Sequence, residues 1–204
     1  MKKFFFVPLV IVCLAPLLLM GAELVPIPLE VKVDKQKAQL GKALFLDPLL
    51  SKDKTLSCAS CHILGHNGAD TVRFSKGIEG QDSAFNSPTV FNAVYNFRQF
   101  WDGRAKNLEE QALNPIVNPI EMGNTIPQVI EDLKKSEKYT RLFRKIYDNG
   151  ITEENLAEVL AEFEKTLITP NAPIDKYLRG DTTALSDHEI EGYRPVSYTH
   201  LRAH

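Results

Sequence analysis

Cys58, Cys61 and His62 form a C-x-x-C-H motif, which constrains this chain more than any other feature of its sequence. The two thiols are three residues apart, so on one helical turn each can add to a vinyl group of a single haem. The histidine that follows then lies beneath the iron as its proximal ligand. The motif therefore predicts a covalently attached c-type haem.

Two other uses of a cysteine pair need partners that the sequence does not supply. A structural zinc site requires four protein ligands, and Cys13 is the only other cysteine in the chain. A thioredoxin-like redox pair belongs to a βαβ unit, and no alternating strand pattern of useful length occurs here. A disulfide between the two would close a very short loop and add little stability. The residues favour covalent haem.

Residues 1–22 differ from the rest of the chain and are predicted to be a secretory signal peptide. A pair of lysines precedes an uncharged run over residues 4–20, and the segment closes on Gly21 and Ala22. An uncleaved membrane anchor and a lipoprotein signal at Cys13 are the weaker alternatives. Export predicts a periplasmic protein.

The composition limits the size of the fold and the choice of partners. The chain has 204 residues, 44% of them hydrophobic, which is enough for one globular domain and part of a neighbour. Lys and Arg number 24 against 26 Asp and Glu. Because there is no basic surplus, a nucleic-acid partner is not expected.

The periodicity of apolar residues predicts an all-α fold with long loops. Each predicted helix begins at a side chain that can cap it: Asp34, Ser87, Asn107, Thr125, Ser136, Thr152 and Ser186. The predicted helices cover about residues 35–46, 88–96, 108–113, 126–135, 137–147, 153–167 and 187–194. Residues 62–86 and 114–124 are predicted to be loops, because they are rich in Gly, Asn, Ser, Asp or Pro.

The sixth coordination position of the iron separates an electron carrier from an enzyme. A carrier fills this position with Met or His, and Met122 is the candidate, since His66 lies only four residues beyond His62. An enzyme leaves the position open. Glu121 follows a proline-stiffened segment, and a carboxylate beside an open iron can move a proton between the two oxygens of peroxide. Gln111 precedes it on a helix.

Three stretches of the sequence resemble the bacterial dihaem cytochrome c peroxidases and the related MauG proteins. They are "LGKALFLDPLLSKDKTLSCASCH", "NSPTVFNAVYNFRQFWDGRAKNLEEQALNPIVNPIEMGN" and "LITPNAPIDKYLRGD". The resemblance covers about residues 38–193 and implies a cytochrome c-like, peroxide-reacting haem domain followed by a second c-type haem domain. It also implies hydrogen peroxide as substrate, a small c-type cytochrome or cupredoxin as electron donor, and a homodimer as one candidate assembly.

The resemblance also assigns roles to single residues. Cys58 and Cys61 would hold the haem, and His62 would bind its iron. Glu121 and Gln111 would lie in the distal pocket, where peroxide reacts.

Two further residues take roles from the resemblance. Trp101 would lie between the two haems as the electron relay, although core packing explains a lone tryptophan equally well. Asn86 would help to hold a calcium ion between the domains of the family.

The sequence departs from the family pattern in two loops. Many members have a histidine sixteen residues beyond the proximal one, which blocks the peroxide haem until reduction, and here that position is Ile78. Because isoleucine cannot bind iron, we expect a five-coordinate haem that needs no reductive activation, as in the MauG branch. Phe85 stands where a basic residue often precedes the asparagine, so the loop around Asn86 is expected to be arranged differently.

Four parts are therefore expected along the chain. They are a signal peptide (1–22), a haem domain (23–180), the opening helix of a second haem domain (181–194) and a non-native tail (195–204). The chain would then be a fragment of a peroxidase. A monohaem electron carrier using Met122 and a MauG-like oxidase that modifies a partner protein are the alternative functions. His200 and His204 are helically spaced, but we assign them to the tail rather than to a metal site.

Overall fold

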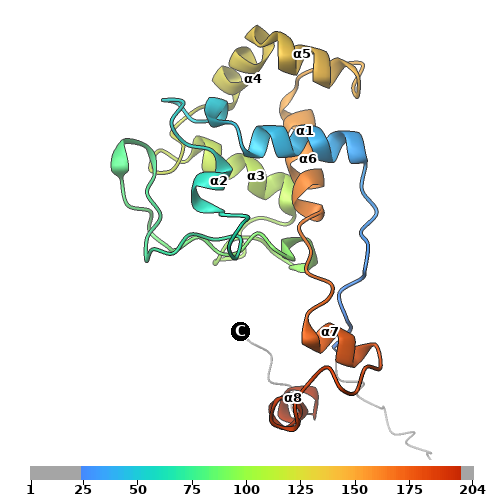
Figure 1. The fold of residues 1–204 in the computed structure, drawn as a ribbon. Coiled ribbons are helices and arrows are strands. Elements are labelled where there is room, and N and C mark those ends of the chain that lie inside the picture. The colour runs from blue at the N-terminus through green and yellow to red at the C-terminus, as the bar shows by residue number, and fades with distance from the viewer. Residues whose placement is uncertain (1–23, 199–204) are drawn as a thin grey trace, which may run out of the picture. The chain divides into compact units, whose positions relative to one another are not determined.

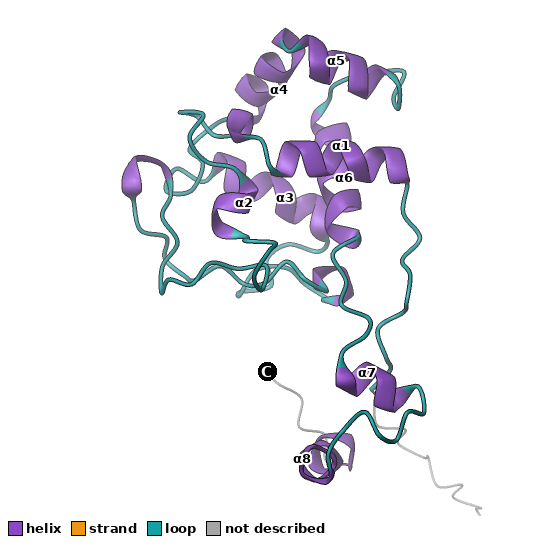
Figure 2. Ribbon diagram, viewed as in Figure 1, coloured by secondary structure: helices purple, strands orange, loops and turns teal. Residues whose placement is uncertain are grey.

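The computed structural model describes residues 24–198, and every regular element in this range is a helix (Figure 1 and Figure 2). Two isolated β-bridges are the only extended pairings among these residues. The predicted all-α fold is confirmed. The predicted signal peptide lies outside the described residues, as do His200 and His204. No described helix has the length and apolar character needed to cross a membrane.

The chain divides into two compact units. The first is Ile27–Ala172, and the described helices of the second begin at Pro173. The domain boundary expected after residue 180 stays a prediction. In chain order the helices are α1 (Lys35–Phe45), η1 (Pro48–Leu50), α2 (Cys58–Cys61), η2 (Ile78–Gly80), η3 (Ala93–Tyr95), α3 (Leu108–Val117), α4 (Ile126–Lys135), α5 (Glu137–Arg144), α6 (Glu153–Lys165), α7 (Pro173–Leu178) and α8 (Asp187–Tyr198).

Helices α1 and α6 cross at the centre of the first unit (Figure 1). Gly41 permits a close crossing, because a Cβ there would lie 1.8 Å from the carbonyl oxygen of Val159. The rings of Phe45 and Phe163 meet edge to face at 5.1 Å. The apolar stripe predicted on the last helix of this unit is buried, as expected, at Leu156, Val159, Leu160 and Phe163. Each such side chain stabilises the fold by about 1.5–3 kcal/mol.

The predicted helix starts are confirmed at most positions. Side chains at these positions accept hydrogen bonds from backbone amides of the first turn: Asp34, Asn107, Thr125, Ser136 and Thr152. Ser186 and Glu189 form the predicted capping box of α8. Local polar chemistry therefore decides where these helices begin.

The helix predicted over residues 88–96 is wrong, since only the short η3 forms there. The Ser87 hydroxyl does not cap a helix but lies 2.8 Å from the hydroxyl of Ser75, in a distant loop. Asn92 has a left-handed backbone, with φ of 62°, and its side chain donates to Thr169. Contacts far apart in the sequence thus override the local helix signal.

Helix α3 extends further than predicted and carries its last turn through Pro115 to Val117. The proline removes one amide donor close to the helix end, where the loss is small. The Asn114 side chain donates to the Glu110 carbonyl at 2.8 Å and satisfies a backbone acceptor within the helix. The prediction that the loop begins at residue 114 is wrong, and the loop over 118–123 begins after the helix.

Two other helix ends differ from the predicted ones. Helix α5 ends at Arg144 rather than at Tyr147, although the Tyr147 amide still donates to the Phe143 carbonyl in a turn. Helix α8 continues through Pro195 to Tyr198, so the predicted end at residue 194 is wrong.

Candidate active site

A cavity of about 340 Å³ lies within the first unit, a volume typical of cofactor sites. Its walls are α2, α3, α6, the loops over residues 75–90 and 99–104, and the segment that follows α3. Every site residue predicted from the sequence lines it: Cys58, Cys61, His62, Asn86, Trp101, Gln111 and Glu121. Met122 lines it as well. The fold thus gathers these residues around one space, while their roles stay predictions.

Helix α2 is a single turn that presents the cysteine motif to the cavity. The Ser57 amide donates to the Ser60 hydroxyl at 3.0 Å, and the His62 amide donates to the Cys58 carbonyl at the same distance. This turn brings both thiols and the imidazole to the cavity. The two cysteines are free thiols.

The thiols are protonated at neutral pH. Burial raises the pKa of Cys58 to about 12, and Glu164 contributes to the rise. Burial also raises the pKa of Cys61. Protonated thiols are poor redox nucleophiles and poor metal ligands. Within residues 24–198 no group of three or more His, Cys, Asp or Glu side chains is placed to hold a metal ion.

His62 is oriented by the loop that follows it. Its Nδ1 lies 3.1 Å from the Gly68 carbonyl oxygen. A ring that carries its proton on Nδ1 donates to this oxygen and keeps the Nε2 lone pair free for a metal. Burial lowers the pKa of His62, which favours the neutral ring. His66 is exposed.

Gly68 is a site residue that the sequence analysis missed. Its φ of +73° is left-handed, and a Cβ there would lie 2.7 Å from the Phe91 ring and 2.8 Å from the Thr89 hydroxyl. Its carbonyl also accepts from the Val90 amide at 3.1 Å. A glycine in the loop after the motif was a visible signal, but the tertiary contacts that require it were not.

Glu121 is half-buried at the cavity wall. Its Oε1 accepts from the Asn118 side-chain amide at 2.8 Å. Burial raises the pKa of this carboxyl, while Asn118 and the charge of Arg104 act in the opposite direction. Asn118 and Arg104 were not predicted as site residues, although both lie within the segments that carry the resemblance. The pKa of the Glu121 carboxyl is therefore set by burial, by the Asn118 hydrogen bond and by the charge of Arg104.

A hairpin-like loop over residues 75–83 holds the backbone around Glu121. The Ile78 amide donates to the Glu121 carbonyl at 2.8 Å, and the Gln81 side chain donates to the Pro119 carbonyl at 3.4 Å. Gly77 allows the close approach, because a Cβ there would lie 1.7 Å from the Ile120 carbonyl oxygen. Ile78 is buried, and its side chain leaves no room for a Cβ on Gly123. This loop braces the segment that carries the candidate acid–base group.

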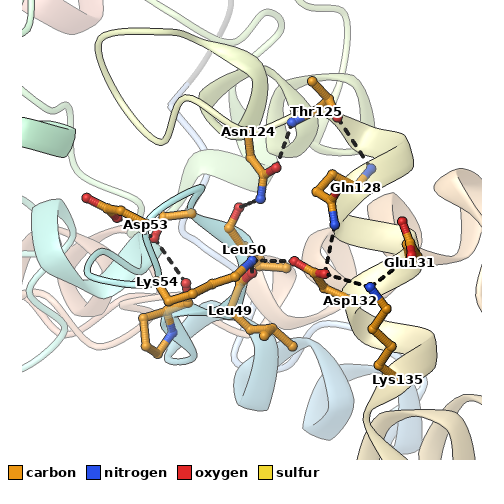
Figure 3. A network of polar contacts seen from close by, with 12 residues as sticks. Leu49, Leu50, Asp53, Lys54, Asn124, Thr125, Gln128, Glu131, Asp132 and Lys135 are labelled. Carbon is orange, nitrogen blue, oxygen red and sulfur yellow. Dashed lines mark hydrogen bonds and ion pairs between the residues drawn. The ribbon is translucent and has the colours of Figure 1, made fainter.

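Polar contacts hold the other end of the same segment (Figure 3). Asn124 is buried, and its side chain donates to the Leu50 carbonyl at 3.0 Å. The Lys54 ammonium donates to the Leu49 carbonyl and forms an ion pair with Asp132 of α4. Gln128 donates to the same carboxylate. These contacts join residues 49–54, just before the cysteine motif, to the end of the segment over residues 118–124 that carries Glu121, called here the Glu121 segment.

Trp101 lies at the rim of the cavity and is 65% exposed. Its Nε1 donates to the Asn86 carbonyl oxygen at 3.1 Å, which joins two loops at this rim. The core-packing interpretation of the tryptophan is wrong. The side chains of Asn86 and Phe85 are also exposed.

A buried carboxyl, Glu164, also lines the cavity and was missed by the sequence analysis. It lies on α6, one turn beyond Leu160, within the apolar face of that helix. An acidic residue interrupting an apolar stripe is a signal that the sequence contained.

The fold of the first unit is all-α and cytochrome c-like. The chain belongs to the di-haem cytochrome c peroxidase family, whose model matches residues 35–183.

Curated relatives and solved structures agree with this assignment. The chain is 47% identical over 170 residues to cytochrome c peroxidase Ccp of Escherichia coli, covering 83% of this chain and 37% of that protein. It is 45% identical to cytochrome c551 peroxidase of Pseudomonas aeruginosa (79% and 48% covered) and 34% identical to MauG of Methylophilus methylotrophus (83% and 51%). A MauG-like protein associated with microbial copper homeostasis superposes with a TM-score of 0.72 at 27% identity, over 83% of this chain and 51% of that one. The chain thus spans about half the length of these relatives or less.

Haem is the cofactor that the name of the family carries, and the residues of the cavity fit it. Two free thiols and a neutral imidazole face the same space. Aliphatic and aromatic side chains, including Phe45, Leu160 and Met122, supply apolar walls for a porphyrin.

Proposed function

We propose that this domain reduces hydrogen peroxide at a c-type haem, with Glu121 as the group that moves the proton. A single observation carries the proposal: the half-buried Glu121 carboxyl shares one cavity with Cys58, Cys61 and His62. Three relatives named cytochrome c or c551 peroxidase are 44–47% identical to this chain, two named MauG are 34–35% identical, and three named cytochrome-c peroxidase IdrP1 or IdrP2 are 31% identical. The 44–47% identity to the first three relatives supports a peroxidase over a protein-modifying oxidase.

Haem c would be held through thioethers to Cys58 and Cys61, with His62 Nε2 on the iron. The hydrogen bond from Nδ1 to Gly68 would keep the imidazole in the orientation that this bond requires. Cleavage of the peroxide O–O bond uses electrons that the bound haem supplies.

Glu121 would act as base and then as acid. Its carboxylate takes the proton from the peroxide oxygen nearer the haem and returns it to the far oxygen, which leaves as water. With two electrons and two further protons, each peroxide becomes two water molecules. Burial brings the pKa of Glu121 closer to neutral pH, where such transfer is efficient. The Gln111 side chain lines the same cavity and would orient the peroxide.

Electrons would reach this haem through a second c-type haem domain that begins at residues 181–194. Trp101 would relay them, since its indole is exposed at the cavity rim. The donor would be a small c-type cytochrome, as the name c551 peroxidase indicates for two relatives, with a cupredoxin as the other candidate. A calcium ion bound with help from Asn86, a homodimer and a periplasmic location after removal of residues 1–22 complete the proposal.

Ile78 supports a haem that reacts with peroxide without prior reduction. Isoleucine has no group that can bind iron, and the buried side chain of Ile78 does not line the cavity. Position 78 therefore supplies no ligand that competes with peroxide for the iron. We expect the oxidised holoprotein to show high-spin haem in its absorption spectrum. A purely low-spin spectrum would reject this part of the proposal.

The test of the function starts from protein matured in an exporting bacterial host. The pigment should resist acid–acetone extraction, because thioether bonds survive it. Glu121→Gln should lower the rate of reaction with peroxide by about 10²–10⁴-fold and leave the haem content unchanged. Glu137→Gln is the matched control, since this glutamate is exposed on α5.

Two outcomes would contradict the peroxidase. Equal peroxide rates in Glu121→Gln and the native chain would remove the acid–base role. A sulfur–iron charge-transfer band that disappears in Met122→Ala would instead indicate the electron carrier.

A further inference from the structure

Glu164 is a second carboxyl inside the cavity, and the proposed peroxide chemistry does not use it. It is 6% exposed and faces the same space as the cysteine motif. Leu160, four residues earlier on α6, lines the cavity too, so the helix presents both side chains on one face. The fold therefore places an acid where the neighbouring positions of the helix are apolar.

Within the described residues of the first unit, Glu164 forms no ion pair and no side-chain hydrogen bond. Burial and the nearby charge of Glu109 raise its pKa to about 8, and no hydrogen bond opposes them. The adjacent cation, Lys165, is bonded to Glu109 and Glu162 instead. A buried carboxylate without a cation or donors is costly, so the neutral acid is the favoured form at pH 7.

The charge of Glu164 is felt at the point where haem would be attached. Glu164 and Cys58 line the same cavity, and the Glu164 carboxylate raises the pKa of Cys58. In an apolar cavity such interactions are stronger than in water. A change of charge at the iron must therefore change the proton affinity of this carboxyl.

We propose that Glu164 is the redox-coupled proton acceptor of this haem pocket, gaining one proton when the iron gains one electron. The inference rests on the proposed haem site but not on peroxide chemistry. In the balanced step, ferric iron takes one electron from a one-electron donor, and the Glu164 carboxylate takes one proton from water. Charge inside the cavity is then unchanged, which removes an electrostatic penalty on each electron that arrives.

The sign of the pH dependence follows from this coupling. Ferric haem is more positive and stabilises the carboxylate, whereas ferrous haem favours the neutral acid. The reduction potential falls as pH rises between the two pKa values of Glu164 and is constant on either side. Other ionisable groups face the same space and act in the background: His62 at the end of α2, and Lys76, Asp102, Arg104 and Glu121 in loops. Glu109 of α3 lies close to Glu164 and acts on it as well.

The experiment is a spectroelectrochemical titration of the holoprotein of this chain at several pH values around 8. The printed sequence has one attachment motif, so a single haem titrates. In the native chain a tenfold change in proton concentration should shift the potential by up to about 59 mV. Glu164→Gln should abolish this shift, because the amide does not titrate. Glu164→Leu, which continues the apolar face, should abolish it too and guards against a folding defect in one variant.

Two controls locate the effect. Glu153→Gln removes the same charge from an exposed position of α6 and should keep the native slope. Glu137→Gln removes an exposed carboxylate of α5 that does not line the cavity, and it should keep the native slope as well.

The results separate this inference from the proposed function. A native slope in Glu164→Gln and Glu164→Leu, or a flat native profile, overturns the inference while leaving peroxide reduction untouched. Peroxide that fails to react with a holoprotein whose potential still follows Glu164 overturns only the peroxidase. A chain that matures without haem overturns both.

Discussion

The two sides of the cavity are built in different ways. The helical wall, formed by α2, α3 and α6, rests on a buried core in which Leu160 and Val159 are almost inaccessible. The loop wall, formed by residues 75–104 and 118–123, has few such anchors. Its backbone is left-handed at Glu79 and Asn92, and large side chains such as Phe97 face solvent.

This difference separates stability from reactivity. The helical wall carries the candidate haem attachment and more buried apolar side chains than the loop wall. The loop wall carries Glu121 and Trp101, whose positions depend on single hydrogen bonds and on glycine contacts. Changes that disturb the packing of the helical wall should destabilise the protein, and changes in the loop wall should slow the reaction with peroxide without unfolding the protein.

Gly41→Ala should have the largest effect, which is a loss of stability. The new Cβ would lie 1.8 Å from the Val159 carbonyl, so α1 and α6 must separate. We expect a loss of at least about 2 kcal/mol in the free energy of unfolding, even though alanine favours helix. Urea denaturation measures it. Gln39→Ala, exposed on the same helix, should change stability little, and equal losses in both variants would contradict a tight crossing.

Gly77→Ala should lower the rate of reaction with peroxide. Its Cβ would lie 1.7 Å from the Ile120 carbonyl oxygen and would push the Glu121 backbone out of place. Because a shift of about 1 Å in a catalytic group costs up to a hundredfold, we expect a ten- to hundredfold slower reaction with peroxide. Stopped-flow absorbance of the haem measures the rate.

Gly65→Ala is the matched control, since nothing lies within 4 Å of a Cβ at this position. If both glycine variants lose the same activity, the brace formed by residues 75–83 has no special role. If Gly77→Ala unfolds the protein, the distinction between the two walls fails.

Asn118→Ala should shift a pH profile rather than abolish activity. The amide of Asn118 lowers the pKa of Glu121, so its removal raises that pKa further. Glu121 accepts a proton only when ionised, and activity is therefore lost as pH falls through its pKa. The acidic limb of the rate profile should therefore move to higher pH. Asn114→Ala, whose side chain bonds the Glu110 carbonyl, should leave the limb in place.

Lys54→Ala should have the smallest effect. Its ion pair with Asp132 lies at the surface, where such pairs contribute about 0.2–1 kcal/mol. A small drop in the urea midpoint that shrinks in high salt, with an unchanged peroxide rate, is the expected result. A tenfold change in rate would mean that the network of Figure 3 positions the Glu121 segment.

The helical wall was largely predictable from the sequence, because its signals are local. Asn107 of α3 and Thr152 of α6 accept hydrogen bonds from amides three residues away, and the sequence displays both partners. The C-x-x-C-H motif is local in the same sense.

The loop wall was less predictable because its contacts join distant segments. Ser87 resembled a helix cap and instead meets Ser75, and Gly77 is required by the backbone of Ile120. The carboxyl of Glu164 went unnoticed because its surroundings come from three helices. That Glu121 and Gln111 line one cavity with the motif was expected only from the family resemblance.

The indole of Trp101 is an intrinsic fluorescence probe of haem binding. The chain contains one tryptophan, and it stands at the mouth of the cavity. Porphyrins absorb the light that this ring emits, so its fluorescence should be bright before the pigment is inserted and dark afterwards. Cofactor loading during biogenesis can thus be timed from the emission of a single side chain, without any added dye.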